Sequence, residues 1–160
     1  MDLRELDTRE LGKHFEHLLM SKLIKLHFDI FVSLLDKGID FIVRVGERDN
    51  GSPRYFEVQV KSVRKEGGRL TISKSTFTPH KGLFLVFFYV KDPEKEEYDT
   101  YVIPSEFVRD EFSSQTQGKR GKNGKEKREI YRLGISNTKL KEIEPYKWND
   151  FEFIPDVWKN

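Results

Sequence analysis

The chain has 160 residues, the size of a single domain with a core large enough to fold alone. It lacks cysteine, which excludes disulfides and thiolate zinc sites, and no apolar run is long enough to span a membrane, so we expect a soluble cytoplasmic protein. With 35% charged residues but a net charge of only +2, the composition by itself gives no reason to expect a polyanionic partner.

The first predicted element is an amphipathic helix that runs from about residue 8 to about Leu26. Asp7 or Thr8 is the expected N-cap, and Glu10 is placed to complete a capping box. Apolar residues recur at spacings of three and four, which puts them on one face that should pack on a sheet. These residues are Leu11, Phe15, Leu18, Leu19 and Leu23.

A strand and a hairpin are predicted next. Phe28 to Leu35 is apolar, with enough aromatic and β-branched residues for a strand, and Asp36 to Gly38 forms a turn. The runs from Gly38 to Val45 and from Tyr55 to Ser62, separated by a polar turn, predict the hairpin. Side chains alternate between the faces of a strand. The second strand therefore carries Glu57, Gln59 and Lys61 on one face and Phe56, Val58 and Val60 on the other.

Asp40 stands at the entry of the first hairpin strand, so strand pairing would bring its carboxylate near Gln59 and Lys61. Carboxylate and amide oxygens are hard ligands that suit Mg²⁺. An ammonium can neutralise charge on a scissile phosphate or help to orient the attacking water. This set of residues suits phosphodiester hydrolysis. The alternative is a solvated sheet face with an ordinary turn aspartate, and both interpretations are open at this point.

Asp40 followed by Gln59-Val60-Lys61 resembles the active-site hairpin of the PD-(D/E)XK nucleases. The form is the variant with glutamine at the usual acidic position, as in Mrr-type restriction endonucleases, and it is also similar to Holliday-junction-resolvase-like proteins. Gly38-Ile39 before the aspartate and Ser62 after the lysine fit the same superfamily. The resemblance spans about residues 7 to 112, some two thirds of the chain.

The resemblance implies an α/β fold of the restriction-endonuclease type, in which a mixed β-sheet is flanked by helices. The length of the chain predicts that residues 1–160 form one domain. The resemblance implies metal-dependent cleavage of DNA with Mg²⁺ as cofactor, for which Mn²⁺ substitutes. It also implies a homodimer, because one such site cuts one strand, and it implies no membrane partner.

The resemblance also assigns roles to individual residues. Asp40 and the main-chain carbonyl of Val60 would bind the metal, with Gln59 at the acidic position. Lys61 would assist the water nucleophile or stabilise the pentacoordinate phosphate. Glu16 follows Gly12 by one turn, which resembles the first-helix glutamate that points into such sites, often after a glycine that permits close helix approach. An ordinary surface glutamate is the alternative.

The middle of the chain supplies further elements. Arg69 to Phe77 is ambiguous between a short strand and a helix start. Gly82 to Val90 is almost continuously apolar, which predicts a central strand covered on both faces. Thr100 to Ile103 predicts another strand, and Glu106 to Phe112 a short helix with Ser105 as its N-cap.

Residues 113–128 contain no apolar residue and three glycines, so we predict a mobile loop. Six basic residues outnumber one acidic residue there, and such side chains would contact a DNA backbone without reading its sequence. A solvated linker is the alternative. The basic residues are Lys119, Arg120, Lys122, Lys125, Lys127 and Arg128.

Glu129 to Ile135 is expected to return as an edge strand. The aromatic residues between Leu140 and Trp158 are expected to cap the core or bury at a subunit contact rather than to stack on bases.

Two alternatives to a DNA nuclease are open on the sequence. One is a catalytically silent nuclease-fold module that binds nucleic acid or a protein partner. The other is an RNA-directed enzyme or binding protein. Convergence of Glu16, Asp40 and Gln59 on one cation would favour an enzyme over the catalytically silent module.

Overall fold

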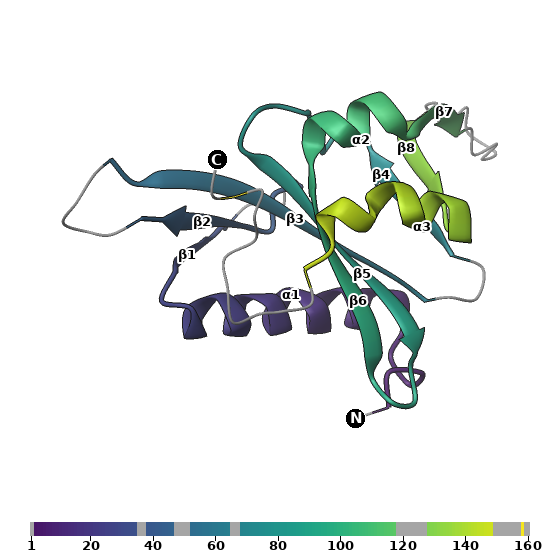
Figure 1. Cartoon of the computed structure of the whole chain (residues 1–160), viewed down its shortest axis with the longest axis horizontal. Helices are drawn as coiled ribbons and strands as arrows, with labels where there is room; N and C mark the ends of the chain where they lie inside the picture. Colours follow the sequence, from purple (N-terminus) through teal and green to yellow (C-terminus); the bar gives the residue numbers. More distant parts are fainter. Residues whose placement is uncertain are drawn as a thin grey trace.

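The computed structural model describes residues 2–34, 38–46, 52–64, 68–117, 128–148 and 158. Within these ranges the chain forms three α-helices, one short 3-10 helix and eight strands in two sheets (Figure 1). The predicted mixed α/β domain is therefore present.

Helix α1 (Thr8–Lys25) begins and ends where local sequence signals place it. The Asp7 carboxylate accepts hydrogen bonds from the main-chain N–H groups of Arg9 (2.7 Å) and Glu10 (2.8 Å), and the Glu10 side chain accepts from the Asp7 N–H (2.8 Å). This is the predicted capping box, which satisfies N–H groups that a helix start leaves unpaired. The buried face carries Leu11, Phe15, Leu19 and Leu23.

The larger sheet is mixed. In spatial order it consists of β1 (Asp29–Val32), β2 (Phe41–Val45), β3 (Arg54–Arg64), β5 (Leu83–Asp92) and β6 (Glu97–Pro104). Strands β3 and β5 are parallel, and the other neighbours are antiparallel. The predicted hairpin, the strand before it and the two strands after it are all present, although β1 is shorter than predicted.

Strand β5 separates two cores, because its side chains alternate between two covered faces. Phe84, Val86, Phe88 and Val90 pack with α1, whereas Leu83, Leu85, Phe87 and Tyr89 pack with the smaller sheet and the remaining helices. Those helices are α2 (Ser105–Glu111) and α3 (Asn137–Ile143). Figure 1 shows α1 on one side of the larger sheet and α2 and α3 on the other. The predicted central strand is confirmed.

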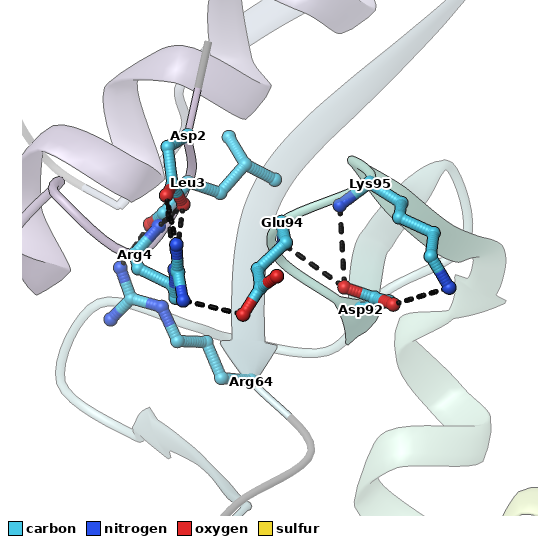
Figure 2. Close-up of polar contacts among 7 residues, drawn as sticks. All are labelled: Asp2, Leu3, Arg4, Arg64, Asp92, Glu94 and Lys95. Atoms are coloured by element: carbon cyan, nitrogen blue, oxygen red, sulfur yellow. Dashed lines mark hydrogen bonds and ion pairs between the residues drawn. The ribbon is translucent and has the colours of Figure 1, made fainter.

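The segment ahead of α1 is fixed to the end of β3 and to the β5–β6 turn (Figure 2). The guanidinium of Arg64 donates to the carbonyls of Leu3 (2.7 Å) and Leu6 (2.5 Å). Arg4 forms an ion pair with Glu94 in the turn, and the Leu3 N–H donates to the carbonyl of Pro93. These contacts hold the start of α1 in place relative to β3.

The smaller sheet corrects two predictions. Its order is β4 (Arg69–Ser73), β8 (Arg128–Gly134) and β7 (Ser113–Gln117), so β8 is a middle strand rather than an edge strand. The prediction of a mobile loop over residues 113–128 is wrong for Ser113–Gln117, which form β7, and for Arg128, which begins β8. Residues 118–127 lie outside the described part of the chain. Tyr131 and Leu133 anchor β8 in the second core, and polar β7 pairs with it through the main chain.

Ser105 is not the N-cap of α2, because it is the first residue of the helix and Pro104 occupies the cap position. Its hydroxyl is fully buried and bonds instead to the main chain of His80. Trp148 and Trp158 are buried in the first core, which confirms the core-capping prediction for these two aromatic residues. No helix in the described ranges has the length and apolar character to cross a membrane.

Candidate active site

The β2–β3 ladder ends where the candidate site begins. Phe41 pairs with Val58, and one residue earlier the Asp40 N–H donates to the Val58 carbonyl (2.9 Å). The next N–H on that edge of β3, from Val60, donates to the Asp40 carboxylate (2.6 Å). In a strand, the N–H and the C=O of one residue point to the same edge. The Val60 carbonyl therefore faces the edge at which the Val60 N–H meets Asp40.

A cleft of about 710 Å³ opens at this edge, between α1, the entry to β2 and the middle of β3. Every residue that the sequence predicted for catalysis or metal binding lines it. These residues are Glu16, Asp40, Gln59, Val60 and Lys61. The hairpin and α1 therefore line one cleft.

Gln59 is buried, with 2% of its surface exposed, and its amide orientation is fixed. Its Nε2 donates to the Gly38 carbonyl (2.5 Å), which needs a donor and so identifies that end of the amide as nitrogen. Its Oε1 is buried and has no hydrogen-bond partner among the described residues. A buried acceptor without a partner costs about 1–3 kcal/mol. This oxygen therefore has an unused acceptor capacity, on a residue that lines the cleft.

Gly38 is required at the entry to β2. Its φ of +90° is unfavourable for other residues, and a Cβ there would lie 1.9 Å from the Thr76 carbonyl oxygen. The close approach brings Thr76 into the wall of the cleft. Gly12 is different, because a Cβ there would meet no described atom within 4 Å. The expectation that Gly12 permits close helix packing is wrong, and its lack of a side chain instead leaves the cleft wall open.

The two carboxylates of the cleft affect each other. Burial raises the pKa of Asp40, and the nearby Glu16 carboxylate raises it further, while the Val60 N–H and the Lys61 ammonium act in the opposite direction. Glu16 is 16% exposed and pairs with Lys13 at 2.5 Å. The site therefore holds negative charge in a partly desolvated position, which a bound cation would relieve.

The donor set fits a hard divalent cation. No group of three or more His, Asp or Glu side chains that would hold a metal occurs in the described ranges. Glu16 and Asp40 nevertheless lie with the unpaired amide oxygen of Gln59 and the Val60 carbonyl around one cleft. A set made only of oxygen atoms, part of it neutral, suits Mg²⁺ or Mn²⁺ rather than zinc.

No family model, curated protein or solved structure matches this chain.

Several polar residues of the cleft wall were given no site role from the sequence, among them Arg9, Lys13, His17 and Thr76. Arg9 and Lys13 lie on the same face of α1 as Glu16, and a helical projection from Glu16 would have found them. His17 directly follows Glu16 in the chain. Thr76 carries no such signal, because the Gly38 contact that positions it joins distant segments.

Of the six basic residues predicted to contact DNA, the structure describes Arg128, and this residue does not line the cleft. Arg128 is the exposed first residue of β8. Lys119, Arg120, Lys122, Lys125 and Lys127 lie outside the described residues.

Replacing Asp40 with asparagine is expected to stabilise the metal-free protein at pH 7, because the cost of burying the charge beside Glu16 disappears. Asparagine still accepts from the Val60 N–H. The pKa of Asp40 is raised in the native state above the 3.8 of the unfolded state. As the pH falls, the native wild type therefore takes up this proton first and loses the buried charge. The stability advantage of the asparagine variant should then disappear near pH 4. A gain of about 1 kcal/mol would raise the Tm by about 2–4 °C. Thermal unfolding in chelator at both pH values measures this.

Asp92→Asn is the matched control. The Lys95 side chain lowers the pKa of Asp92, so removal of this carboxylate should leave the Tm unchanged or slightly lower at pH 7. A lower Tm for Asp40→Asn than for wild type at pH 7 would contradict the expected relief of charge.

Proposed function

We propose that this chain is a metal-dependent DNA endonuclease of the PD-(D/E)XK type that hydrolyses phosphodiester bonds. The observation that carries the proposal is the cleft that Glu16, Asp40 and Lys61 line together with Gln59, whose buried amide oxygen has no partner among the described residues. Distant parts of the chain supply these groups, and a solvated sheet face would require neither their convergence nor a buried, unpaired acceptor.

Asp40, Glu16, Gln59 and the Val60 carbonyl are the groups that would hold Mg²⁺ or Mn²⁺. When bound, the cation supplies an activated water and neutralises charge on the phosphate. The Val60 N–H and burial fix the Asp40 carboxylate in position before any ligand arrives. Lys61 lies close enough to influence Asp40 and presents its ammonium to a phosphate in the cleft.

The wall of the cleft favours a polyanionic substrate. Arg9, Lys13 and His17 line it from α1, and Lys61 lines it from β3. Cationic side chains on two walls suit a phosphate backbone that passes between them. One cleft cuts one strand, so we also propose that a homodimer makes a double-strand cut.

A catalytically silent module that binds nucleic acid or a protein partner is the second candidate. Glutamine replaces a carboxylate at position 59, and Glu16 is paired with Lys13 at 2.5 Å. Both features weaken the attraction for a cation relative to a site with three free carboxylates.

Nicking of supercoiled plasmid tests the proposal. Wild-type protein should nick the plasmid with Mg²⁺ or Mn²⁺ and should lose this activity in EDTA. Branched DNA and RNA in the same assay would identify the preferred substrate. Undiminished nicking in EDTA would contradict metal dependence. Salt-sensitive DNA binding without cleavage of any substrate would favour the silent module.

A further inference from the structure

A second cavity of about 170 Å³ lies beside the cleft. It shares Ile39 and Thr76 with the cleft, so the two adjoin. Glu57 reaches it from the face of β3 that also carries Gln59 and Lys61. A group that is covalently attached to a phosphate in the cleft would therefore lie near this cavity.

The volume limits the ligand. It greatly exceeds the roughly 30 Å³ that one water molecule occupies in the liquid. It is smaller than the roughly 300–1,000 Å³ of pockets for drug-sized ligands. A single planar ring system is the size of group that fits.

One polar wall consists of Glu57 and His80, whose Oε2 and Nε2 atoms lie 3.2 Å apart. The other ring nitrogen of His80 faces the Lys81 carbonyl at 3.0 Å. Both neighbours of the ring are acceptors, so an imidazolium with two N–H donors satisfies both. The Lys81 carbonyl and then Glu57 accordingly raise the pKa of His80, and the nearby Glu106 acts in the same direction.

Ser105 fixes the main chain of His80 from inside the fold. Its buried hydroxyl accepts from the His80 N–H (3.0 Å) and donates to the His80 carbonyl (2.9 Å). The histidine is therefore anchored where it meets Glu57, although its ring is half exposed. The remaining walls are apolar at Ile39 and Leu83 and hydroxylated at Thr76 and Thr78.

The charge of this cavity indicates whether its ligand is a phosphate or a base. A phosphate would meet the Glu57 carboxylate, while the two N–H groups of His80 already face acceptors. Within the described residues, Glu57 Oε1 accepts no hydrogen bond. A carboxylate acceptor suits the exocyclic amine of cytosine, and apolar walls with an imidazole suit the faces of a base.

We infer that this cavity is a base-recognition subsite that holds one unstacked base with an exocyclic amino group, beside the phosphate in the cleft. The inference rests on the proposed function and narrows its substrate to DNA in which a base next to the cleaved phosphate leaves the stack. Unstacking is least costly in single-stranded DNA.

Binding of short single-stranded oligo(dC) and oligo(dU) of equal length to the full-length protein in EDTA tests the inference. The two ligands carry the same backbone charge, and their bases differ at the exocyclic amine and the adjoining N3 of cytosine, which are a carbonyl and an N–H in uracil. Wild type should bind oligo(dC) about tenfold more tightly, which corresponds to about 1.4 kcal/mol. In Glu57→Gln the affinities should fall within about twofold of each other, because an amide accepts from cytosine and donates to uracil. Fluorescence anisotropy at one salt concentration measures this ratio.

Glu111→Gln removes the same charge from α2, outside both cavities, and should keep the tenfold ratio. Equal wild-type affinities, an unchanged ratio in Glu57→Gln, or no binding of either oligonucleotide would overturn the inference. Plasmid nicking reports separately on the nuclease. Nicking without a cytosine preference would refute only the base subsite, and a preference that depends on Glu57 without nicking would refute only the nuclease.

Discussion

Asp40→Asn and Lys61→Met are each expected to reduce the initial rate of plasmid nicking by about 100- to 1,000-fold, the usual cost of losing one preorganised charged group at a reaction centre. Asparagine removes the charge of a metal ligand, so a higher Mg²⁺ concentration should restore part of the rate. Methionine removes the ammonium that faces the phosphate, and Mg²⁺ should not compensate for it. Initial rates across a Mg²⁺ titration measure both effects.

Matched controls are available on β5. Asp92→Asn and Lys91→Met make the same chemical changes at residues that pair with Lys95 and Asp99 and do not line the cleft. Both controls should keep wild-type rates. Full cleavage by either Asp40→Asn or Lys61→Met would refute the assignment of this site.

Trp158→Ala is expected to destabilise the protein by about 3–5 kcal/mol, the range for removing a buried aromatic side chain. Trp158 is fully buried, stacks on Phe56 and meets Phe28, Phe84 and Trp148 edge-on or tilted. The loss is a large fraction of the roughly 5–15 kcal/mol that stabilises a typical domain. Chemical denaturation of wild type and variant measures it.

Trp158→Phe distinguishes the contribution of aromatic packing to stability from the cost of the buried indole N–H. The indole N–H of Trp158 is buried without a hydrogen-bond partner among the described residues, so its removal relieves one unfavourable contribution. This variant should be much more stable than Trp158→Ala. Tyr55→Ala, at an aromatic residue that is 56% exposed, should cost much less. A Trp158→Ala variant as stable as Tyr55→Ala would show that the tryptophan does not hold the first core together.

Local signals in the sequence predicted most of the larger sheet. The Asp7 cap, the alternation after Tyr55 and the apolar run that became β5 each depend on neighbouring residues, and each element lies where it was expected. The smaller sheet depends on pairing between residues 69–73, 113–117 and 128–134, which no local pattern reveals. A polar segment such as β7 pairs through its main chain, so its composition wrongly indicated a loop.

The site was predictable only in part for the same reason. The spacing of Asp40, Gln59 and Lys61 identified the hairpin, and the position of Glu16 one turn after Gly12 singled it out by resemblance. The meeting of Gly38 with Thr76 depends on the tertiary fold, as does the position of His80. The second cavity was therefore missed entirely.

The contact between Asp40 and the Val60 N–H also bears on the open part of the β3 edge. An open strand edge is a template on which another extended chain can add, and natural proteins often protect such edges with inward-pointing charge. Beyond Val58, the edge of β3 meets the Asp40 carboxylate in place of a further β2 residue. The carboxylate proposed for catalysis thus also places a charge at this edge of β3, a feature that hinders the pairing of another chain there whether or not the protein cuts DNA.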